Sequence, residues 1–310
     1  MRRFAIVTFA ALALLAGCKR RRPEVFTKIW LGPNEACGRI KSGDVICWGG
    51  GEPARPVPER RDVTDLALGQ TRSCALRGEA VACEGPAVKS DPKVTATKVV
   101  VGGGHACAVL TSGVRCWGKN DEGQAAGWSA PVRAIAAGEA HTCVAVEGEA
   151  VHCFGRGFGG GRKLLPGVGV RGLAAGKEQT CALLDDGSVR CWTAQGEPAR
   201  VEGLAGATEI TAGYAHACAR LGNGSVSCWG ENVHYQLADG TSEKRTRATP
   251  VQGLFGVTEI VAAADGTCVR LGEGEVKCWG NDDHGQLAWP ALPPGPINVP
   301  TPIRYLRPAP

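Results

Sequence analysis

The sequence predicts an all-β protein folded as a seven-bladed β-propeller. Two cysteines separated by nine or ten positions recur seven times along the 310 residues. Glycine (45 residues) and proline (19 residues) are too frequent for long helices, because both disfavour the helix interior. A pattern that repeats every 33 to 50 residues is typical of a repeat architecture, and a closed ring of small four-stranded sheets fits that period.

Each repeat centres on a cysteine-to-cysteine hairpin, as in Cys181 to Trp192. Val189 and Cys191 share one face of a strand because side chains alternate along it, and Gly187 provides the turn. The two cysteines then face each other across the hairpin, at a separation that suits a disulfide. The seven expected disulfides are Cys37–Cys47, Cys74–Cys83, Cys107–Cys116, Cys143–Cys153, Cys181–Cys191, Cys218–Cys228 and Cys268–Cys278.

Two further strands are expected in each repeat. An aliphatic residue eight positions before the first cysteine and, in six copies, a glycine five positions before it mark one strand. Proline-valine pieces such as Pro131-Val132 and Pro250-Val251 indicate the other. The first repeat lacks this strand, whereas 300–305 is left over at the end of the chain. We therefore expect the C-terminal strand to join the first repeat and close the ring. A linear solenoid would need polar end caps, and none is visible.

The N-terminus has the pattern of a bacterial lipoprotein signal. A basic start and a short apolar run lead to Leu15-Ala16-Gly17-Cys18, which resembles a lipobox. Residues 1–17 are the predicted signal peptide, and Cys18 is the predicted lipidation site. An ordinary secretory signal is the alternative. Fifteen cysteines make seven pairs plus Cys18, and export explains the pairs, because disulfides persist in oxidising compartments.

A short basic tether, residues 18–24, follows the signal peptide. Lys19 directly after Cys18 resembles lipoproteins sent to the outer membrane, so we expect an extracytoplasmic protein of the cell envelope, held at the membrane by its lipid anchor. The chain has a formal net charge of +5, and residues 1–22 carry six basic residues and no acid, which leaves −1 for the rest. That balance argues against nucleic acid as a partner.

Residues 25–310 form one predicted propeller domain, and three of its repeats share a longer motif. A Trp-Gly pair is followed by glutamine seven positions after the tryptophan, from Trp117 to Gln124, Trp229 to Gln236 and Trp279 to Gln286. This motif resembles the repeat of the regulator of chromosome condensation family, over residues 25–306. The resemblance implies a seven-bladed propeller used as an interaction platform. It implies no nucleotide exchange on a nuclear GTPase, because an exported protein does not meet that partner.

No catalytic, cofactor or metal cluster is predicted. His105, His141 and His216 occupy the same position in three repeats, so they cannot converge on one metal, and a structural hydrogen bond is the expected role. The cysteine spacing lacks the short knuckle of structural zinc sites. We expect the tryptophans that follow the second cysteine to be core between blades, with an exposed ligand cage as the alternative.

Loops on one propeller face are the expected partner-binding region, because binding residues concentrate on loops held by a rigid scaffold. The longest insertion runs from Ala238 to Thr249, and Asn120 to Trp128 forms a second long loop. A merely longer loop is the alternative. The candidate partner-binding residues are Asn120, Trp128, His234, Tyr235, Lys244, Arg245 and Arg247.

The sequence therefore predicts a monomeric, non-enzymatic lipoprotein that binds or scaffolds an unknown protein partner. Repeats without a catalytic cluster, an export signal and paired cysteines support this interpretation. One alternative is an inhibitor of a secreted or periplasmic enzyme. Another is a protein that binds or acts on envelope glycans, which would need converging acids or aromatic residues.

Overall fold

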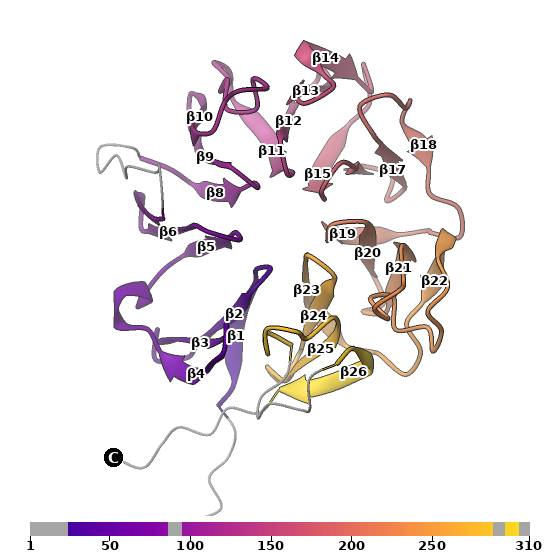
Figure 1. Cartoon of the computed structure of the whole chain (residues 1–310). Coiled ribbons are helices and arrows are strands. Elements are labelled where there is room, and N and C mark those ends of the chain that lie inside the picture. The colour runs from indigo at the N-terminus through magenta and orange to yellow at the C-terminus, as the bar shows by residue number, and fades with distance from the viewer. Residues whose placement is uncertain (1–23, 86–94, 288–294, 304–310) are drawn as a thin grey trace, which may run out of the picture.

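Seven small sheets surround a central channel in the computed structural model of the chain, which describes residues 24–85, 95–287 and 295–303 (Figure 1). The predicted seven-bladed propeller is thereby confirmed. Within these ranges no helix is both long and apolar enough to cross a membrane. Predictions for Cys18, the signal peptide and most of the tether lie outside the described residues.

Every blade is an antiparallel sheet whose first strand lines the channel. The strands of blades 1 to 3 are β1 (Phe26–Leu31), β2 (Glu35–Ile40), β3 (Val45–Gly49) and β4 (Glu52–Pro56); β5 (Asp65–Leu68), β6 (Ser73–Arg77) and β7 (Ala80–Glu84); β8 (Lys98–Val101), β9 (His105–Leu110) and β10 (Gly113–Gly118). Those of blades 4 and 5 are β11 (Val132–Ala137), β12 (His141–Val146), β13 (Val151–Gly155) and β14 (Gly159–Leu164); β15 (Val170–Ala175), β16 (Thr180–Leu184), β17 (Val189–Trp192) and β18 (Ala199–Arg200). Those of blades 6 and 7 are β19 (Ala207–Ala212), β20 (His216–Leu221), β21 (Val226–Gly230) and β22 (Arg245–Pro250); β23 (Val257–Ala263), β24 (Gly266–Leu271), β25 (Val276–Gly280) and β26 (Ile297–Ile303).

Blades 2 and 3 depart from the expected four strands. In the described residues each has three strands, and single bridges between Ala80 and Thr95 and between Val114 and Trp128 stand where the outer strand would pair. The only helical element described is a 3₁₀ turn, η1 (Pro58–Arg60), between blades 1 and 2. The repeat therefore fixes the inner three strands more firmly than the outermost one.

The strand directions give the propeller two distinct faces. We call one the loop face: it carries the turns from first to second strands and the loops from third to fourth strands. The other is the hairpin face, with the turns inside the disulfide hairpins and the connections between blades. His105 pairs with Gly118, so the histidine position and the end of the Trp-Gly strand lie together on the loop face, as expected.

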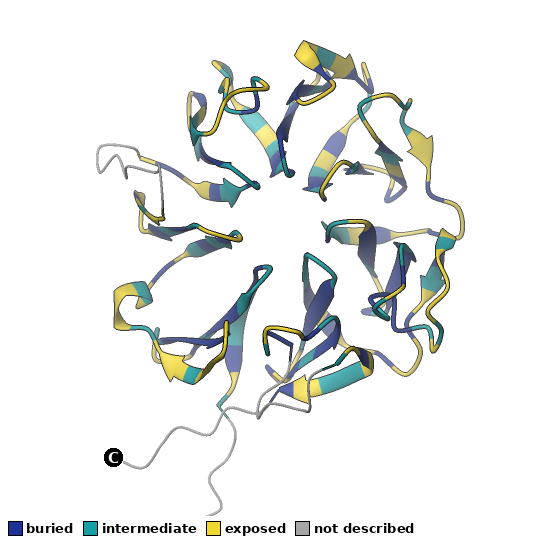
Figure 2. Ribbon diagram, in the orientation of Figure 1, coloured by how far each residue is buried: buried dark blue, intermediate teal, exposed yellow. Residues whose placement is uncertain are grey.

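The seven predicted disulfides are all present, each joining directly opposed residues of the second and third strands (for example Cys181 and Cys191). Buried residues follow the inner strands and the surfaces between blades, and exposed residues gather at the outer edge of the propeller (Figure 2). Four of the five predicted core tryptophans are buried, namely Trp48, Trp192, Trp229 and Trp279, and Trp117 is half-buried.

The expected closure of the ring by strand exchange is wrong. The C-terminal strand β26 pairs with β25, Thr301 opposite Cys278, and so completes blade 7 rather than blade 1. Blade 1 has its own outer strand, β4, which ends at Pro56 just as β22 ends at Pro250. The proline of such a proline-valine piece is thus the last residue of the outer strand, and that strand pairs with the hairpin before it in the sequence. Pro131-Val132 is an exception, because Val132 begins the inner strand β11.

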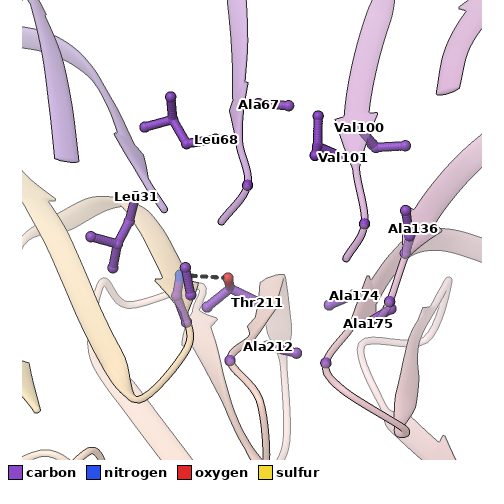
Figure 3. Close-up of a pocket in the computed structure, with 18 of the residues that line it drawn as sticks. Leu31, Ala67, Leu68, Val100, Val101, Ala136, Ala174, Ala175, Thr211 and Ala212 are labelled. Carbon is purple, nitrogen blue, oxygen red and sulfur yellow. Dashed lines mark hydrogen bonds between the residues drawn. The ribbon is translucent and has the colours of Figure 1, made fainter. Parts of the chain in front are cut away.

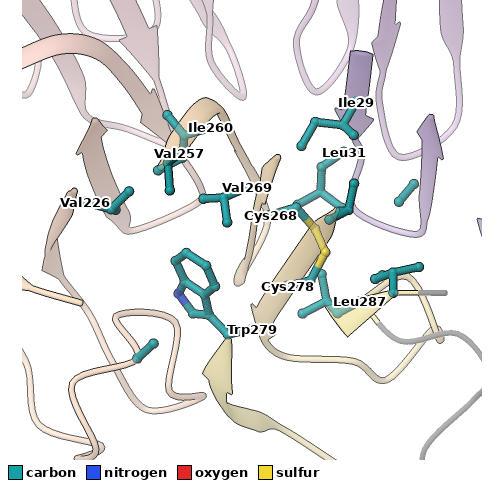
Figure 4. Packing of buried hydrophobic residues seen from close by; sticks show 14 of the residues in the cluster. Ile29, Leu31, Val226, Val257, Ile260, Cys268, Val269, Cys278, Trp279 and Leu287 are labelled. Carbon is teal, nitrogen blue, oxygen red and sulfur yellow. A yellow bond between two sulfur atoms is a disulfide. The ribbon is translucent and has the colours of Figure 1, made fainter. Parts of the chain in front are cut away.

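Side-chain packing closes the ring instead. One buried cluster spans blades 6, 7 and 1, with Trp279 and Ile29 on its two sides (Figure 4). The backbone N–H of Phe26 donates to the carbonyl of Gly274 at 3.2 Å, and Lys28 forms a 3.1 Å ion pair with Glu259. The seam between the two ends of the chain is therefore packed much as the other blade interfaces are.

Candidate functional site

Three buried histidines join neighbouring blades on the loop face. His105, His141 and His216 each place Nε2 within 2.7–2.8 Å of a threonine hydroxyl in the next blade. The threonine partners are Thr142, Thr180 and Thr267, respectively. Each threonine directly precedes the first cysteine of its blade. The histidines are therefore structural, as expected, and their hydrogen bonds run between blades.

The repeated glycine is required by this histidine and by the next blade. A Cβ on Gly213 would lie 2.2 Å from Cε1 of His216 and 2.3 Å from the carbonyl oxygen of Ala264. Gly102 and Gly138 are enclosed in the same way. Blade 7 lacks both members of the pair: Ala263 stands at the glycine position and Gly266 at the histidine position. Blades 1, 2 and 5 keep the glycine although Glu35, Arg72 and Gln179 stand at the histidine position, so the next blade also requires it: a Cβ on Gly176 would lie 2.2 Å from the carbonyl oxygen of Gly213.

Burial keeps these histidines neutral. Desolvation lowers the pKa of His105 and of His141 to about 4, and that of His216 to about 3. Nearby charge on His141 and Arg72 adds to the effect at His105. A neutral imidazole at pH 7 is compatible with the hydrogen bond to the threonine hydroxyl.

The turns on the loop face form a partial ring of hydrogen bonds around the channel mouth. Each turn donates a backbone N–H to the turn of the next blade, from blade 3 through to blade 7. The bonds are Gly103 to Glu139 (3.1 Å), Glu139 to Lys177 (3.3 Å), Lys177 to Tyr214 (2.9 Å) and Tyr214 to Ala264 (2.6 Å). A partner that contacts this mouth would meet a rigid rim carrying acidic, basic and aromatic side chains.

The channel itself has a cavity of about 320 Å³, and its lining exposes polar and apolar atoms in similar amounts. Its wall consists of small or aliphatic side chains from the inner strands, such as Leu68, Val101, Ala175 and Ala212, and the Thr211 hydroxyl accepts a 2.8 Å hydrogen bond from the backbone N–H of Ala262 (Figure 3). The volume is at the low end of the range for small-molecule sites. Glu139, Lys177 and Tyr214 also line it, at the mouth on the loop face.

Charged residues stand at the opposite end of the channel. Lys28 pairs with Glu259, while Asp65 accepts hydrogen bonds from Trp30 and from the backbone of Val99. Lys98 begins β8 at this level, and desolvation lowers its pKa although solvent in the channel still reaches the side chain. Lys28, Glu259 and Asp65 are thus paired with groups at their own end of the channel.

The three Trp-Gly…Gln loops are built identically. The glutamine side chain accepts a hydrogen bond from the backbone two residues earlier, for example from His234 to Gln236 Oε1 at 2.8 Å. An Asn or Asp side chain accepts from the backbone five residues later, as Asn232 does from Leu237 at 3.0 Å. The backbone carbonyl of the glutamine can also accept a hydrogen bond from the next blade: Trp279 Nε1 donates to the Gln236 carbonyl at 2.9 Å.

Blade 6 departs from this shared loop at two surface positions. Val233 is 62% exposed where the sibling loops have Asp121 and Asp283. Tyr235 has φ of 60°, at the position where Gly123 and Gly285 adopt φ of 82° and 67°. A tyrosine in this left-handed conformation costs free energy that glycine avoids. The loop therefore carries two residues that its geometry does not require.

The structure separates the predicted partner-binding residues. His234 and Tyr235 lie together on the loop face, beside Val233, and Tyr214 emerges from the first turn of the same blade. Lys244 is exposed there and pairs with Glu231 at 2.6 Å. Asn120 also lies on the loop face, but its side chain accepts a 2.8 Å hydrogen bond from the backbone of Ala125 and so shapes its own loop.

Three other candidate residues lie in strands or make contacts within the protein. Trp128 pairs with Val114 near the hairpin end of blade 3, and its ring packs 4.5 Å from that of His152 in blade 4. Arg245 is committed to Asp239 at 2.6 Å, and Arg247 lies in the outer strand β22. The insertion that contains them is thus mostly strand and an internally bonded turn.

Val233 and Tyr214 are not among the residues that the sequence predicted, although both lie on the loop face of blade 6. Alignment of the three sibling loops would have marked Val233, because valine replaces aspartate there. Among the described residues, the only group of three potential metal ligands is Glu35 with Cys37 and Cys47. Both sulfurs are consumed by the disulfide and contacted by Arg60, so the group cannot serve as a thiolate site.

Comparison with known families identifies three of the blades. The model of the regulator of chromosome condensation (RCC1) repeat matches residues 96–124, 207–236 and 257–286. These three segments are similar to the RCC1 repeat. They are the repeats that carry the complete Trp-Gly…Gln loop, as the sequence resemblance indicated, and in blades 6 and 7 they run from the inner strand to the glutamine. No curated protein sequence matches the chain.

Solved propellers support the same fold. Human WBSCR16 is 16% identical with a TM-score of 0.66, over 78% of this chain and 85% of its own. The Crinkly WD40 ectodomain of the receptor kinase ACR4 from Arabidopsis thaliana is 20% identical with a TM-score of 0.61, over 92% and 100%. Prp20p from Saccharomyces cerevisiae, described with its binding to Gsp1p and histones, is 15% identical with a TM-score of 0.54, over 90% and 76%. At these identities the likeness concerns the fold.

Proposed function

We propose that this protein is a non-enzymatic scaffold that binds a protein partner through the loop face of blade 6. The RCC1-like propeller implies a protein-binding scaffold, and the observation that selects this face is the exposed Val233 beside the strained Tyr235. Both residues differ from those at the same positions in the Trp-Gly…Gln loops of blades 3 and 7, which share the loop's hydrogen bonds. Strain at a surface position is retained where function uses it.

The chemistry of the face suggests the kind of partner. Val233, Tyr235 and Tyr214 offer apolar and aromatic surface, while Glu139 and Lys177 stand at the neighbouring channel rim. Aromatic anchors with a polar surround are typical of protein interfaces. The partner we propose therefore presents an apolar side chain to this cluster.

Seven disulfides indicate an oxidising, extracytoplasmic environment. Within that environment we propose that Cys18 carries lipid and holds the protein at the cell envelope, in the outer membrane, as a monomer. The lipobox-like Leu15-Ala16-Gly17-Cys18 and the unpaired fifteenth cysteine support this proposal. An inhibitor of an envelope enzyme would use the same face in the same compartment.

Affinity capture tests the proposal. The oxidised body, residues 24–310, serves as bait against envelope and secreted fractions, beside a variant with Val233→Asp and Tyr235→Gly. This variant introduces the residues that blade 7 has at these two positions, Asp283 and Gly285, so we expect it to keep the fold. A partner retained by the wild type and lost by the variant is the expected result. A partner bound equally by both would overturn this face as the site.

The captured partner also distinguishes scaffold from inhibitor. An enzyme that forms a tight one-to-one complex and loses activity in it would make the protein an inhibitor. A partner without loss of activity supports the scaffold.

A further inference from the structure

One exposed aromatic residue on the hairpin face is not explained by the fold. Phe255 is 74% exposed in the connection between blades 6 and 7. The connection between blades 5 and 6 has the same pattern, Val-x-Gly-Leu-x-Gly, with Ala205 at the equivalent position. The two connections thus provide an internal comparison for the phenylalanine.

The two connections have the same conformation. Both glycines of each adopt positive φ, at 67° and 69° for Gly253 and Gly256. Leu204 and Leu254 are both buried. After each connection, the first residue of the next strand donates one 3.0 Å backbone hydrogen bond to the turn of the preceding hairpin. Alanine therefore satisfies this turn, and the phenylalanine is not needed for folding.

The chain enters the propeller beside this residue. Phe26 donates its backbone N–H to the carbonyl of Gly274, as Val257 donates to Gly224 in the blade before. By this correspondence Glu24 stands at the entry of blade 1 where Phe255 stands at the entry of blade 7. The two positions are therefore on the same face, one blade apart, and Val25, directly after Glu24, is also exposed.

The length of the tether brings that face to the membrane. If Cys18 is lipidated, as proposed above, six residues from Lys19 to Glu24 join the anchor to the first blade. Fully extended, they span about 20 Å. Because the tether is attached at the hairpin end of the inner strand β1, it favours contact between the hairpin face and the lipid.

We propose that the hairpin face of blades 7 and 1 rests on the lipid surface, with Phe255 inserted at the interface between headgroups and acyl chains. Phenylalanine contributes apolar area at that depth without burying charge. Contact at Phe255 adds a second attachment beside the anchor, and the loop face of blade 6 then points away from the membrane toward its partner.

Photocrosslinking on the intact mature lipoprotein tests this proposal. The protein is placed in vesicles of phosphatidylethanolamine and phosphatidylglycerol, with p-benzoylphenylalanine at position 255, 205 or 233. We expect lipid adducts at position 255, several-fold fewer at 205 and none at 233 on the loop face. Equal adduct levels at 255 and 205, or adducts mainly at 233, would overturn it.

Two readouts separate this proposal from those on which it rests. The mass of the N-terminal peptide reports whether Cys18 is acylated; an unmodified cysteine overturns both the anchor and the membrane contact. With acylation present, lack of lipid adducts at 255 overturns only the contact. Adducts to a protein at 255 in native membranes would assign Phe255 to a protein interface instead. Partner capture by the loop face is measured separately and depends on neither result.

Discussion

Blades 6 and 7 are the two most similar regions of the molecule, and they differ in two distinct ways. Between their first and second strands, Gly213 and His216 become Ala263 and Gly266, a pair of changes that exchange one filled space for another. In their Trp-Gly…Gln loops, Asp283 and Gly285 correspond to Val233 and Tyr235, with no compensating change. Compensated differences maintain packing, whereas the uncompensated differences at the surface mark the place where we propose that a partner binds.

The largest expected effect comes from replacing Gly213 while His216 stays in place. Gly213→Ala places a methyl group 2.2 Å from His216 and 2.3 Å from the Ala264 carbonyl, so the turn or the neighbouring blade must shift. We expect a loss of about 3 kcal/mol in the free energy of unfolding, measured by urea titration.

The reverse change in blade 7 is the control. Ala263→Gly at the same repeat position removes a methyl group and adds backbone entropy to the unfolded chain, so about 1 kcal/mol is expected. Equal losses for the two variants would mean that the glycine is not needed at this position in blade 6.

The buried histidines predict a loss of stability in acid. The folded pKa of His216 is about 3, below the ordinary value of 6.5, so the unfolded state binds the proton more readily. The stability from neutral His216 is complete above pH 6.5 and is lost as the pH falls toward 3, at up to about 1.4 kcal/mol per pH unit. Between pH 6.5 and 5 this amounts to about 2 kcal/mol.

Urea titrations at several pH values check this dependence, with His216→Gln as the comparison. The variant keeps a hydrogen-bonding side chain but cannot titrate, so its stability should fall less steeply between pH 6.5 and 5. A slope identical to that of the wild type would contradict the assignment to His216.

The hairpins could be predicted from sequence because each depends on local contacts. Cysteine spacing, the turn glycine and alternation determine which residues oppose one another, and all seven pairs are confirmed. The position of β26 could not be predicted in this way. A proline-valine piece can pair with the hairpin before it or after it, and only packing in three dimensions decides between them.

The candidate site was predicted less completely than the fold. The insertion of blade 6 was predicted to bind a partner because it is the longest one. Its length does not show that Arg245 pairs with Asp239 or that Arg247 belongs to an outer strand. Tyr235 was among the candidate residues, and its strain appears only in the backbone angle. Exposure and φ are properties of the folded chain, so a single sequence leaves them open.

The tryptophans test whether the loop motif stabilises the next blade. Trp279 donates Nε1 to Gln236, whereas Trp192 Nε1 is buried with no partner in the described part of the chain, since blade 4 has no glutamine at that position. Trp279→Phe should therefore destabilise the protein by about 1 kcal/mol more than Trp192→Phe. Chemical denaturation of both variants measures this difference. Because both variants lose the same ring volume, most of the destabilisation from that loss cancels between them. A zero difference would mean that the hydrogen bond adds no net stability.

The smallest expected effect is a gain, and it separates stability from function most clearly. Tyr235→Gly restores the residue that both sibling loops have at this backbone angle, so the free energy of unfolding should rise by about 1 kcal/mol. Partner capture should fall, because the aromatic ring is removed from the loop face. The matched change Gly285→Tyr in blade 7 should lower stability by a similar amount without adding binding, since Asp283 replaces the apolar neighbour there. If Tyr235→Gly lowers both stability and capture, the tyrosine supports the loop itself, and the uncompensated difference between the two blades is structural.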